Sequence, residues 1–314
     1  MRDSSAPGRR AAVPPVSVPR PGRAWRGAAV EAGPPRLLTF AFFRKVRMSP
    51  AFPRRMAELA SLWRTLVSQE LAVRYRGTLL GRVWPLLMPL LMLALYGFVF
   101  GLVFRARWPG LAPDDHLGFT VNLFTGLLIH GLLAEAVGQA PTLMQRNSNF
   151  VRKMVFPLPV LVAVPLGVAL AHAAVGFGLL VLVNGLFGSG WHATALALPL
   201  VLAPYLVLLY GLALVFAALG VYIRDLGQVA GVLVMVALFT GAVFFPAELV
   251  PEALSGLLRA NPIVWPTEAA RACLLRGEWP DAGAMAAYWL AAAAALAVGL
   301  RVFAVLRRGF ADLL

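Results

Sequence analysis

Few side chains in this chain have the types and spacing that catalysis needs. None of the four histidines pairs with another at metal-ligand spacing on one helix face, and the single cysteine, Cys273, permits no intrachain disulfide. Both lysines, Lys45 and Lys153, follow an arginine, so the Gly-x-x-x-x-Gly-Lys-Ser/Thr loop that holds ATP phosphates is absent. We therefore predict that the chain is not an enzyme and that it binds no cofactor or metal ion itself.

An enzyme is the alternative, because a membrane-embedded transferase could use carboxylates outside the bilayer. The candidates are Asp114, Asp115, Glu248, Glu252, Glu268, Glu278 and Asp281. Acidic residues scattered in this way are usually only solvated. An enzyme of this class should lose activity when one of these carboxylates is neutralised.

Aromatic side chains offer another chemistry, because flat rings make broad, weakly directional contact with sugar rings and let a long polymer slide. They concentrate near three apolar stretches of the chain. The candidates for a translocation path are Trp84, Tyr96, Phe100, Phe104, Phe244 and Phe245. For any single ring the alternative is a position facing lipid.

The elements that carry these rings are predicted to cross a membrane. Residues 154–223 contain no Asp, Glu, Lys or Arg, and a bilayer core is crossed by about 20 apolar residues in a helix. Hydrophobic residues make up 60% of the chain and charged residues 13%. The sequence therefore predicts an all-α integral membrane protein with six transmembrane helices. They fall at 83–104, 117–134, 154–187, 193–223, 226–247 and 282–300.

Some polar residues lie inside these apolar stretches, where hydrocarbon penalises them. They are Asn122, His130, Glu135, His172, Asn184 and Arg301. Glu135 and Arg301 fall near helix ends and can extend to the interface, which leaves His130 and His172 as the deeper ones. Either histidine has a functional interpretation or a plain hydrogen bond to a neighbouring helix.

The distribution of basic residues predicts that both termini are cytoplasmic. With that orientation the inner side carries Arg64, Arg74, Arg76, Arg82, Arg146, Arg152, Lys153, Arg224, Arg307 and Arg308. The outer side carries Arg105, Arg107, Arg259, Arg271 and Arg276. More than half of the 28 basic residues precede residue 83, so the net charge of +14 indicates contact with anionic membrane lipids and not with nucleic acid.

Before the first span the chain has two parts. Residues 1–50 are rich in Pro, Arg, Ala and Gly and are predicted to be disordered. Residues 51–82 form an amphipathic interface helix, with Trp63 on its apolar side and Arg74, Arg76 and Arg82 at its end. The six-span domain then occupies residues 83–314. A plain helical linker is the alternative for residues 51–82.

The segment from 245 to 281, between the fifth and sixth spans, contains five prolines and only short apolar pieces. We expect short helices there. They are either re-entrant, shielded by protein or water, or part of a surface loop.

The boundary of the first span carries the most specific motif in the chain. It reads Tyr75-Arg76-Gly77-Thr78-Leu79-Leu80-Gly81-Arg82-Val83-Trp84-Pro85, followed by Pro89. This resembles the permease subunit of type-2 ABC exporters, in the branch for polysaccharides and polyol phosphates such as O-antigen, capsule and teichoic acid. Further motifs of that family resemble Gly126-Leu127-Leu128, Lys153-Met154-Val155-Phe156-Pro157, Arg224-Asp225 and Asn261-Pro262. Thr78, Met88 and Gly241-Ala242 depart from its pattern, which affects the expected glycan specificity and not the fold.

The resemblance covers most of residues 56–314 and implies partners. It implies a homodimer that joins two copies of a separate ATPase, which binds ATP and magnesium, in a bacterial inner membrane. The loop 141–153 would hold the coupling helix that docks on the ATPase, through Gln145, Arg146, Asn147, Ser148, Asn149 and Arg152. Arg224 and Asp225 are either an ion pair at the inner ends of two spans or simple loop charges.

The function that follows is export of a lipid-linked polysaccharide or polyol phosphate polymer from the cytoplasm. Two alternatives remain. A type-2 ABC permease could move small lipophilic drugs or lipids, and a stand-alone transporter would work without an ATPase.

Overall fold

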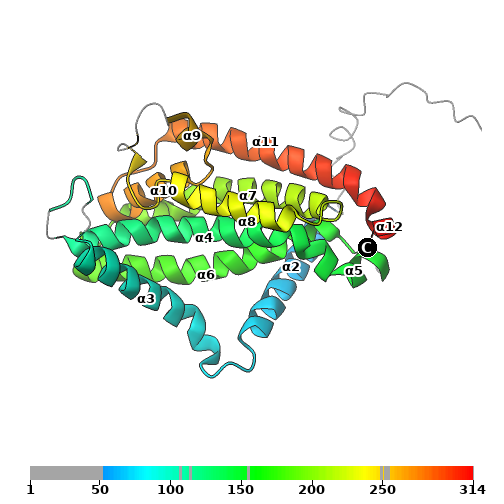
Figure 1. Cartoon of the computed structure of the whole chain (residues 1–314), viewed down its shortest axis with the longest axis horizontal. Helices are drawn as coiled ribbons and strands as arrows, with labels where there is room; N and C mark the ends of the chain where they lie inside the picture. Colours follow the sequence, from blue (N-terminus) through cyan, green and yellow to red (C-terminus); the bar gives the residue numbers. More distant parts are fainter. Residues whose placement is uncertain are drawn as a thin grey trace, which may run out of the picture. The chain divides into compact units, whose positions relative to one another are not determined.

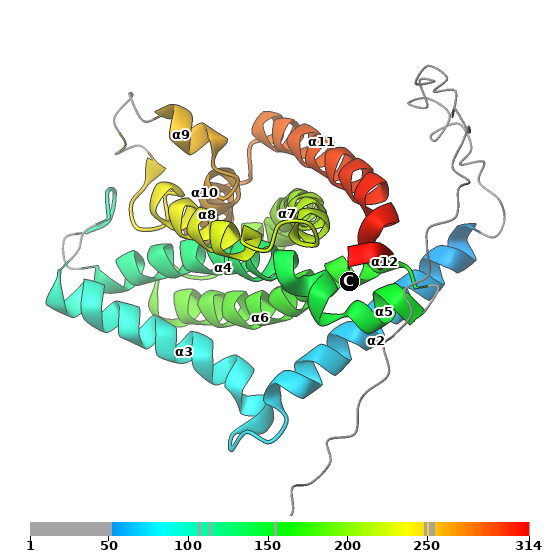
Figure 2. The ribbon, with the colours of Figure 1, turned by 45° about the vertical axis from the view of Figure 1, so that its right-hand side comes forward.

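The computed structural model describes residues 52–105, 108–112, 115–153, 156–247, 250 and 255–313. The predicted disordered extension, residues 1–50, lies outside them. Within the described ranges every regular element is a helix, as the sequence predicts. Figures 1 and 2 show the arrangement of these helices.

Five helical segments are long and apolar enough to cross a membrane. They are α3 (Trp84–Tyr96) with the π-helix η2 (Gly97–Val103), α4 (His116–Arg146), α6 (Leu158–Phe187), η3 (Ala193–Ala197) with α7 (Leu198–Gly220), and α11 (Ala282–Leu306) with η7 (Arg307–Gly309). The other elements are α2 (Phe52–Tyr75), η1 (Gly81–Val83), α5 (Ser148–Lys153), α8 (Leu226–Thr240), α9 (Ser255–Ala260), α10 (Val264–Arg271), η6 (Ala272–Arg276) and α12 (Phe310–Leu313). The short helices expected between residues 245 and 281 are therefore α9, α10 and η6.

The expected fifth span, α8, is shorter than the others. It has 15 residues, which at 1.5 Å per residue cover about 22 Å, less than the ~30 Å core of a bilayer. The chain leaves the helix at Gly241, and Ala242 has a φ of 55°, in the left-handed region. Six spans thus stay a prediction, since α8 is apolar but shorter than a bilayer core is thick.

Helix α4 lies at the centre of the bundle and packs against α6, α7, α8 and η2. It extends well past the expected end at residue 134, because Pro141 lies inside the helix without ending it. Helices α7 and α11 approach closely through glycine: a Cβ on Gly211 would lie 2.6 Å from the backbone of Ala295. These contacts make one bundle of α4, α6, α7, α8 and α11.

The interface helix α2 packs on α6. The Nε1 atom of Trp63 donates to the carbonyl oxygen of Ala163 at 2.9 Å, and Val67 is buried against Val164 and Val168. Its apolar side was expected to rest on lipid, but α6 covers part of it. Hydrophobic periodicity marks the buried face of a helix without saying whether protein or lipid covers it.

Helices α2 and α3 meet in a V whose vertex points away from the bundle (Figures 1 and 2). Gly77 (φ 76°) and Gly81 (φ 49°) form the vertex in left-handed conformations that other residues rarely adopt. At the far end of the V, Gly97 and Gly101 let η2 approach the start of α4 closely. Most side chains of α3 and η2 stay exposed, with 11% of this apolar segment buried.

Candidate translocation path and coupling surface

The bundle has two ends. The coupling end is where α4 ends, α5 lies and α6 begins, and the distal end is where η2 ends and α4 begins.

Four of the six expected path residues form one aromatic cluster near the distal end. The ring centroid of Phe100 lies 6.2 Å from Tyr96, 5.6 Å from Phe104 and 6.2 Å from Phe244. These separations are typical of interacting aromatic rings. Tyr96, Phe100, Phe104 and Phe244 are called the aromatic row below.

Three further rings extend the aromatic row. Phe119 of α4 stacks on Phe100 at 6.1 Å, Trp108 lies 5.8 Å from Phe119, and Phe239 of α8 stacks on Phe244 at 5.6 Å. The rings come from α3, η2, α4, α8 and the segments after η2 and α8. A row built from so many separate segments could not be recognised from sequence, although all seven rings lie near span ends.

Trp84 and Phe245, the other two expected path residues, form no ring pair among the described residues. Trp84 begins α3, at the opposite end of this helix from Tyr96. The aromatic row therefore has its centre at Phe100, and Trp84 is separated from it by the length of α3.

Arg271 is a fully buried cation that sequence reasoning treated only as an outer basic residue. Its guanidinium donates to the backbone carbonyls of Asn122 (3.1 Å), Ala242 (2.8 Å) and Val243 (3.0 Å). It also pairs with Glu268 at 2.7 Å. Arg271 thus ties the break after α8 to α4 and α10, directly beside Phe244 of the aromatic row.

The same guanidinium lies over Trp108, 4.5 Å from the ring centroid. Burial lowers the pKa of Arg271 to about 10, while the neighbouring Glu268 carboxylate acts in the opposite direction. Arg271 is therefore charged at neutral pH, and its charge is balanced by Glu268, carbonyl dipoles and the indole face. No local motif announces such a site, because its partners lie up to 149 residues away in sequence.

The expected coupling loop is mostly helical. Helix α4 continues to Arg146, Asn147 caps it, and the short helix α5 follows. The side-chain amide of Gln145 donates to the carbonyl oxygen of Gly220 at 2.9 Å, so the end of α4 is joined to the end of α7. The side chain of Arg146 is exposed.

The remaining expected docking residues lie in and before α5. Ser148 is half-buried and Asn149 is exposed, while the side chain of Arg152 lies outside what the structure describes. Phe150 packs on Phe156 with ring centroids 5.2 Å apart, which anchors α5 against the start of α6. Helix α5 is therefore a short element held at the coupling end between α4 and α6.

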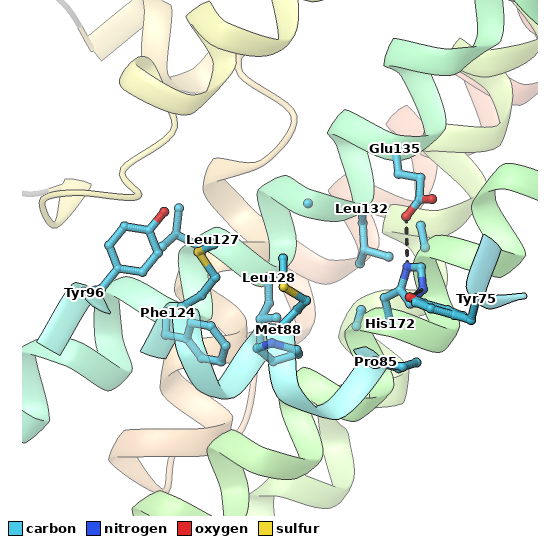
Figure 3. Close-up of a pocket in the computed structure, with 15 residues that line it drawn as sticks. Tyr75, Pro85, Met88, Tyr96, Phe124, Leu127, Leu128, Leu132, Glu135 and His172 are labelled. Atoms are coloured by element: carbon cyan, nitrogen blue, oxygen red, sulfur yellow. Dashed lines mark hydrogen bonds and ion pairs between the residues drawn. The ribbon is translucent and has the colours of Figure 1, made fainter. Parts of the chain in front are cut away.

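A polar cluster joins α2 to α4 and α6. Arg74 pairs with Glu135 at 2.5 Å. Glu135 contacts Nδ1 of His172 at 3.3 Å, and the hydroxyl of Tyr75 lies 2.7 Å from Nε2 of His172 (Figure 3). Burial raises the pKa of Tyr75, so its hydroxyl stays protonated at neutral pH. We call these four residues the α2 clasp.

The α2 clasp changes the interpretation of two sequence features. Arg74 was expected at the headgroup level, but it binds a carboxylate of α4. Glu135 was expected to extend to the interface, but it is the acceptor that joins Arg74 and His172. Arg76 is exposed, and the side chain of Arg82 lies outside the described part.

Arg224 and Asp225 do not pair with each other. Both are exposed between α7 and α8, and none of the ion pairs among the described residues joins them. Asp225 precedes α8 as its N-cap residue, without a side-chain capping bond. The structure shows no ion pair between them, and the simpler interpretation, loop charges, agrees with it.

The other polar residues of the spans have protein partners. Nε2 of His130 lies 3.0 Å from the carbonyl oxygen of Val234, which ties α4 to α8. The amide of Asn184 donates to the loop after α6 and to Leu274. Asn122 bonds within α4, and Arg301 is exposed. These contacts account for His130, Asn122 and Asn184 without a ligand.

The outer carboxylates also have structural contacts where they are described. Asp115 and Asp281 accept from backbone amides at the starts of α4 and α11, each at 2.7 Å. Glu268 pairs with Arg271, and Glu278 pairs with Arg276. Asp114, Glu248 and Glu252 lie outside the described residues. Within the described part, no group of three or more His, Cys, Asp or Glu residues could hold a metal ion.

A cavity of about 370 Å³ lies inside the V, between α3 and the pair α4 and α6. Its wall is mostly apolar, and Figure 3 shows Tyr96 and Phe124 toward one end and Tyr75, Glu135 and His172 at the other. The α2 clasp therefore closes the end of the cavity nearer the coupling end.

Comparison with known proteins identifies the family of this chain. Residues 61–275 match the family described as "ABC-2 type transporter". An "O-antigen export system permease protein RfbA" from Klebsiella pneumoniae is 24% identical over 217 residues, which cover 69% of this chain and 81% of that protein. A protein of the same name from Myxococcus xanthus is 26% identical over 263 residues, 82% of this chain and 97% of the relative. Because the matched region covers more than half of the chain, the chain belongs to the ABC-2 type transporter family.

Proposed function

We propose that this chain is the membrane permease of an ATP-driven exporter for a lipid-linked polysaccharide or polyol phosphate polymer. The observation that carries the proposal is the aromatic row, which lies beside α4 between η2 and the end of α8. Its rings are apolar, and the exposed ring of Phe104 can make weakly directional contact with a sugar chain. Similarity to O-antigen export permeases supports a polysaccharide as the substrate class.

The proposed polymer needs a path shielded from lipid, and one copy of the chain does not enclose the aromatic row. Phe104 is 66% exposed and Phe239 is 59% exposed. Helices α3 and α8, which carry or flank the row, both expose long apolar faces. We infer that a second copy packs against α3 and α8, so that the homodimer encloses a path lined by two aromatic rows.

The energy source of the proposed exporter is a separate ATPase, which membership of the ABC-2 type transporter family supports. Two ATPase subunits would dock on the coupling end, one on each copy, through Gln145, Arg146, Asn147, Ser148, Asn149 and α5. The hydrogen bond from Gln145 to Gly220 would pass movement of the docked end to α7 as well as α4.

The direction of transport depends on the orientation in the membrane. The coupling end carries Arg64, Arg146, Arg224, Arg307 and Arg308. By the rule that short cytoplasmic segments are rich in Lys and Arg, this end and both termini face the cytoplasm of a bacterial inner membrane. The distal end then opens to the outside, where the polymer leaves.

The test is purification of the tagged chain from its native membranes in a mild detergent, followed by mass spectrometry of the intact complex. We expect two copies of this chain with two copies of an ATPase subunit. Recovery of this chain without an ATPase, repeated in lipid nanodiscs, would contradict the proposal and favour a stand-alone transporter.

A further inference from the structure

The cavity inside the V has the shape of a site for an extended apolar chain. Along α3 its lining runs from Pro85 to Tyr96, a distance of about 16 Å at 1.5 Å per residue. Half of a bilayer core is also about 15 Å thick. The cavity is therefore about as long as one leaflet is deep, and it runs along α3.

The lining of the cavity fits hydrocarbon. Met88 and Met92 of α3 face Leu128 and Leu132 of α4, and Ala173 of α6 leaves room between them. Both methionines remain exposed, at 44% and 36%, although they line the cavity. Methionine is flexible and adapts its shape to an apolar neighbour. Because these methionines are exposed, the cavity opens to the surroundings, where its apolar wall suits hydrocarbon and not a polar group.

The two ends of the cavity differ in polarity, which sets the direction of a bound lipid. At the end nearer the coupling end, the wall carries Tyr75, Glu135 and His172 of the α2 clasp, and Arg74 reaches Glu135 from outside this lining. Glu135 is already paired with Arg74 and His172, so the clasp does not present an unpaired anion. The charges of Arg74 and Glu135 offset each other, and the exposed Arg76, next to the clasp in sequence, supplies a cation that suits a lipid phosphate.

From this geometry we propose that the cavity binds one acyl chain of a membrane phospholipid. The lipid belongs to the leaflet at the coupling end, and its phosphate lies at the level of Arg74 and Arg76. The bound acyl chain fills the space between α3 and the pair α4 and α6, and it provides packing contacts for α3 on that side. The site lies within one copy of the chain and does not require the proposed export function.

Two glycines of α4 provide a matched test. A Cβ added at Gly131 or at Gly138 would meet no atom within 4 Å, but only Gly131 lines the cavity. We would purify the wild type, Gly131→Leu and Gly138→Leu in a mild detergent and count phospholipids on the intact protein by native mass spectrometry. We expect the wild type and Gly138→Leu to retain one phospholipid per chain and Gly131→Leu to lose it at least fivefold.

A second pair of variants guards against misfolding of the leucine variant. Met88→Gln with Met92→Gln makes the cavity lining polar, while Leu91→Gln with Leu95→Gln makes the same change at the same spacing on exposed positions outside the cavity. We expect lipid loss only in the first pair. The proposal is overturned if both pairs retain the lipid equally, if the wild type carries none, or if the retained mass is that of a polyprenyl phosphate. Loss of the ATPase from the complex would leave this result unchanged, so the two proposals fail separately.

Discussion

At the scale of single residues, Arg271 holds together the backbone around the distal end. Three backbone carbonyls, from α4 and from the break after α8, accept hydrogen bonds from its guanidinium. The break exists because Ala242 takes a left-handed conformation and the helix cannot continue. A buried cation with five donors in a fixed plane suits several carbonyls at once.

We expect Arg271→Met to lower the free energy of unfolding by about 3 kcal/mol, because it removes the donors of buried carbonyls and leaves Glu268 without this partner. The measurement is a denaturant titration in mixed micelles. The control is Arg276→Met, since Arg276 is 43% exposed and lies on the same segment. Equal stability of the two variants would show that Arg271 has no special role.

The α2 clasp predicts energetic coupling between two helices that are far apart in sequence. We expect Arg74→Ala and Glu135→Ala to be non-additive, with a coupling energy of about 1 kcal/mol, because the pair is partly buried and His172 supports it. The measurement is a double-mutant cycle on the free energy of unfolding.

The matched cycle uses Arg276 and Glu278, whose side chains are 43% and 61% exposed. Exposed pairs contribute little, so their coupling should be close to zero. If the cycle at Arg74 and Glu135 gave the same value as this exposed pair, the clasp would not hold α2 on the bundle.

At the scale of elements, the coupling segment combines a rigid and an exposed part. Helix α4 runs without interruption from the distal end, where Phe119 joins the aromatic row, to the exposed Arg146 at the coupling end. A continuous helix is a contiguous mechanical link between the proposed docking site and the proposed path.

We expect Arg146→Glu to uncouple ATP hydrolysis from export and to reduce export at least tenfold while the protein stays folded. The reason is that Arg146 is exposed at the end of α4, where a reversed charge would oppose docking without disturbing the bundle. Export and ATPase activity are measured in parallel in proteoliposomes. Arg276→Glu, at an arginine 43% exposed in η6 and outside the coupling end, is the control, and unchanged export in Arg146→Glu would contradict the docking assignment.

The sequence predicted the helical membrane fold and the approximate starts of the expected spans, because uncharged apolar stretches have few other stable forms. It did not predict where α4 and α8 end. Pro141 lies within α4, and α8 stops at Gly241 although residues after it are apolar. Both ends depend on tertiary contacts, such as the bond from Gln145 to Gly220 and those from Arg271.

The sequence also predicted only part of the candidate site. Each aromatic residue of the row could be named from its position near a span end, but Trp84 and Phe245 satisfied the same criterion without joining it. The α2 clasp and Arg271 were missed because their partners are separated by many residues and share no local pattern. Composition and periodicity report what is buried, whereas specific polar contacts depend on which helices become neighbours.

At the scale of the whole molecule, the proposed path requires the aromatic rows of two copies to face each other. Removing rings from the row of both copies should therefore impair transport without preventing assembly. We expect Tyr96→Ala, Phe100→Ala and Phe104→Ala combined to slow export about tenfold, because the polymer loses the ring faces it contacts in both copies. The measurement is ATP-driven export in proteoliposomes, with native mass spectrometry to confirm the complex.

Trp279→Ala is the control, since Trp279 is an aromatic residue 68% exposed and forms no ring pair among the described residues. Equal export by the triple variant and the wild type would mean that the polymer crosses elsewhere. Dissociation of the triple variant, in contrast, would assign these rings to the dimer contact, because Phe104 is exposed on the face where the second copy is proposed to pack.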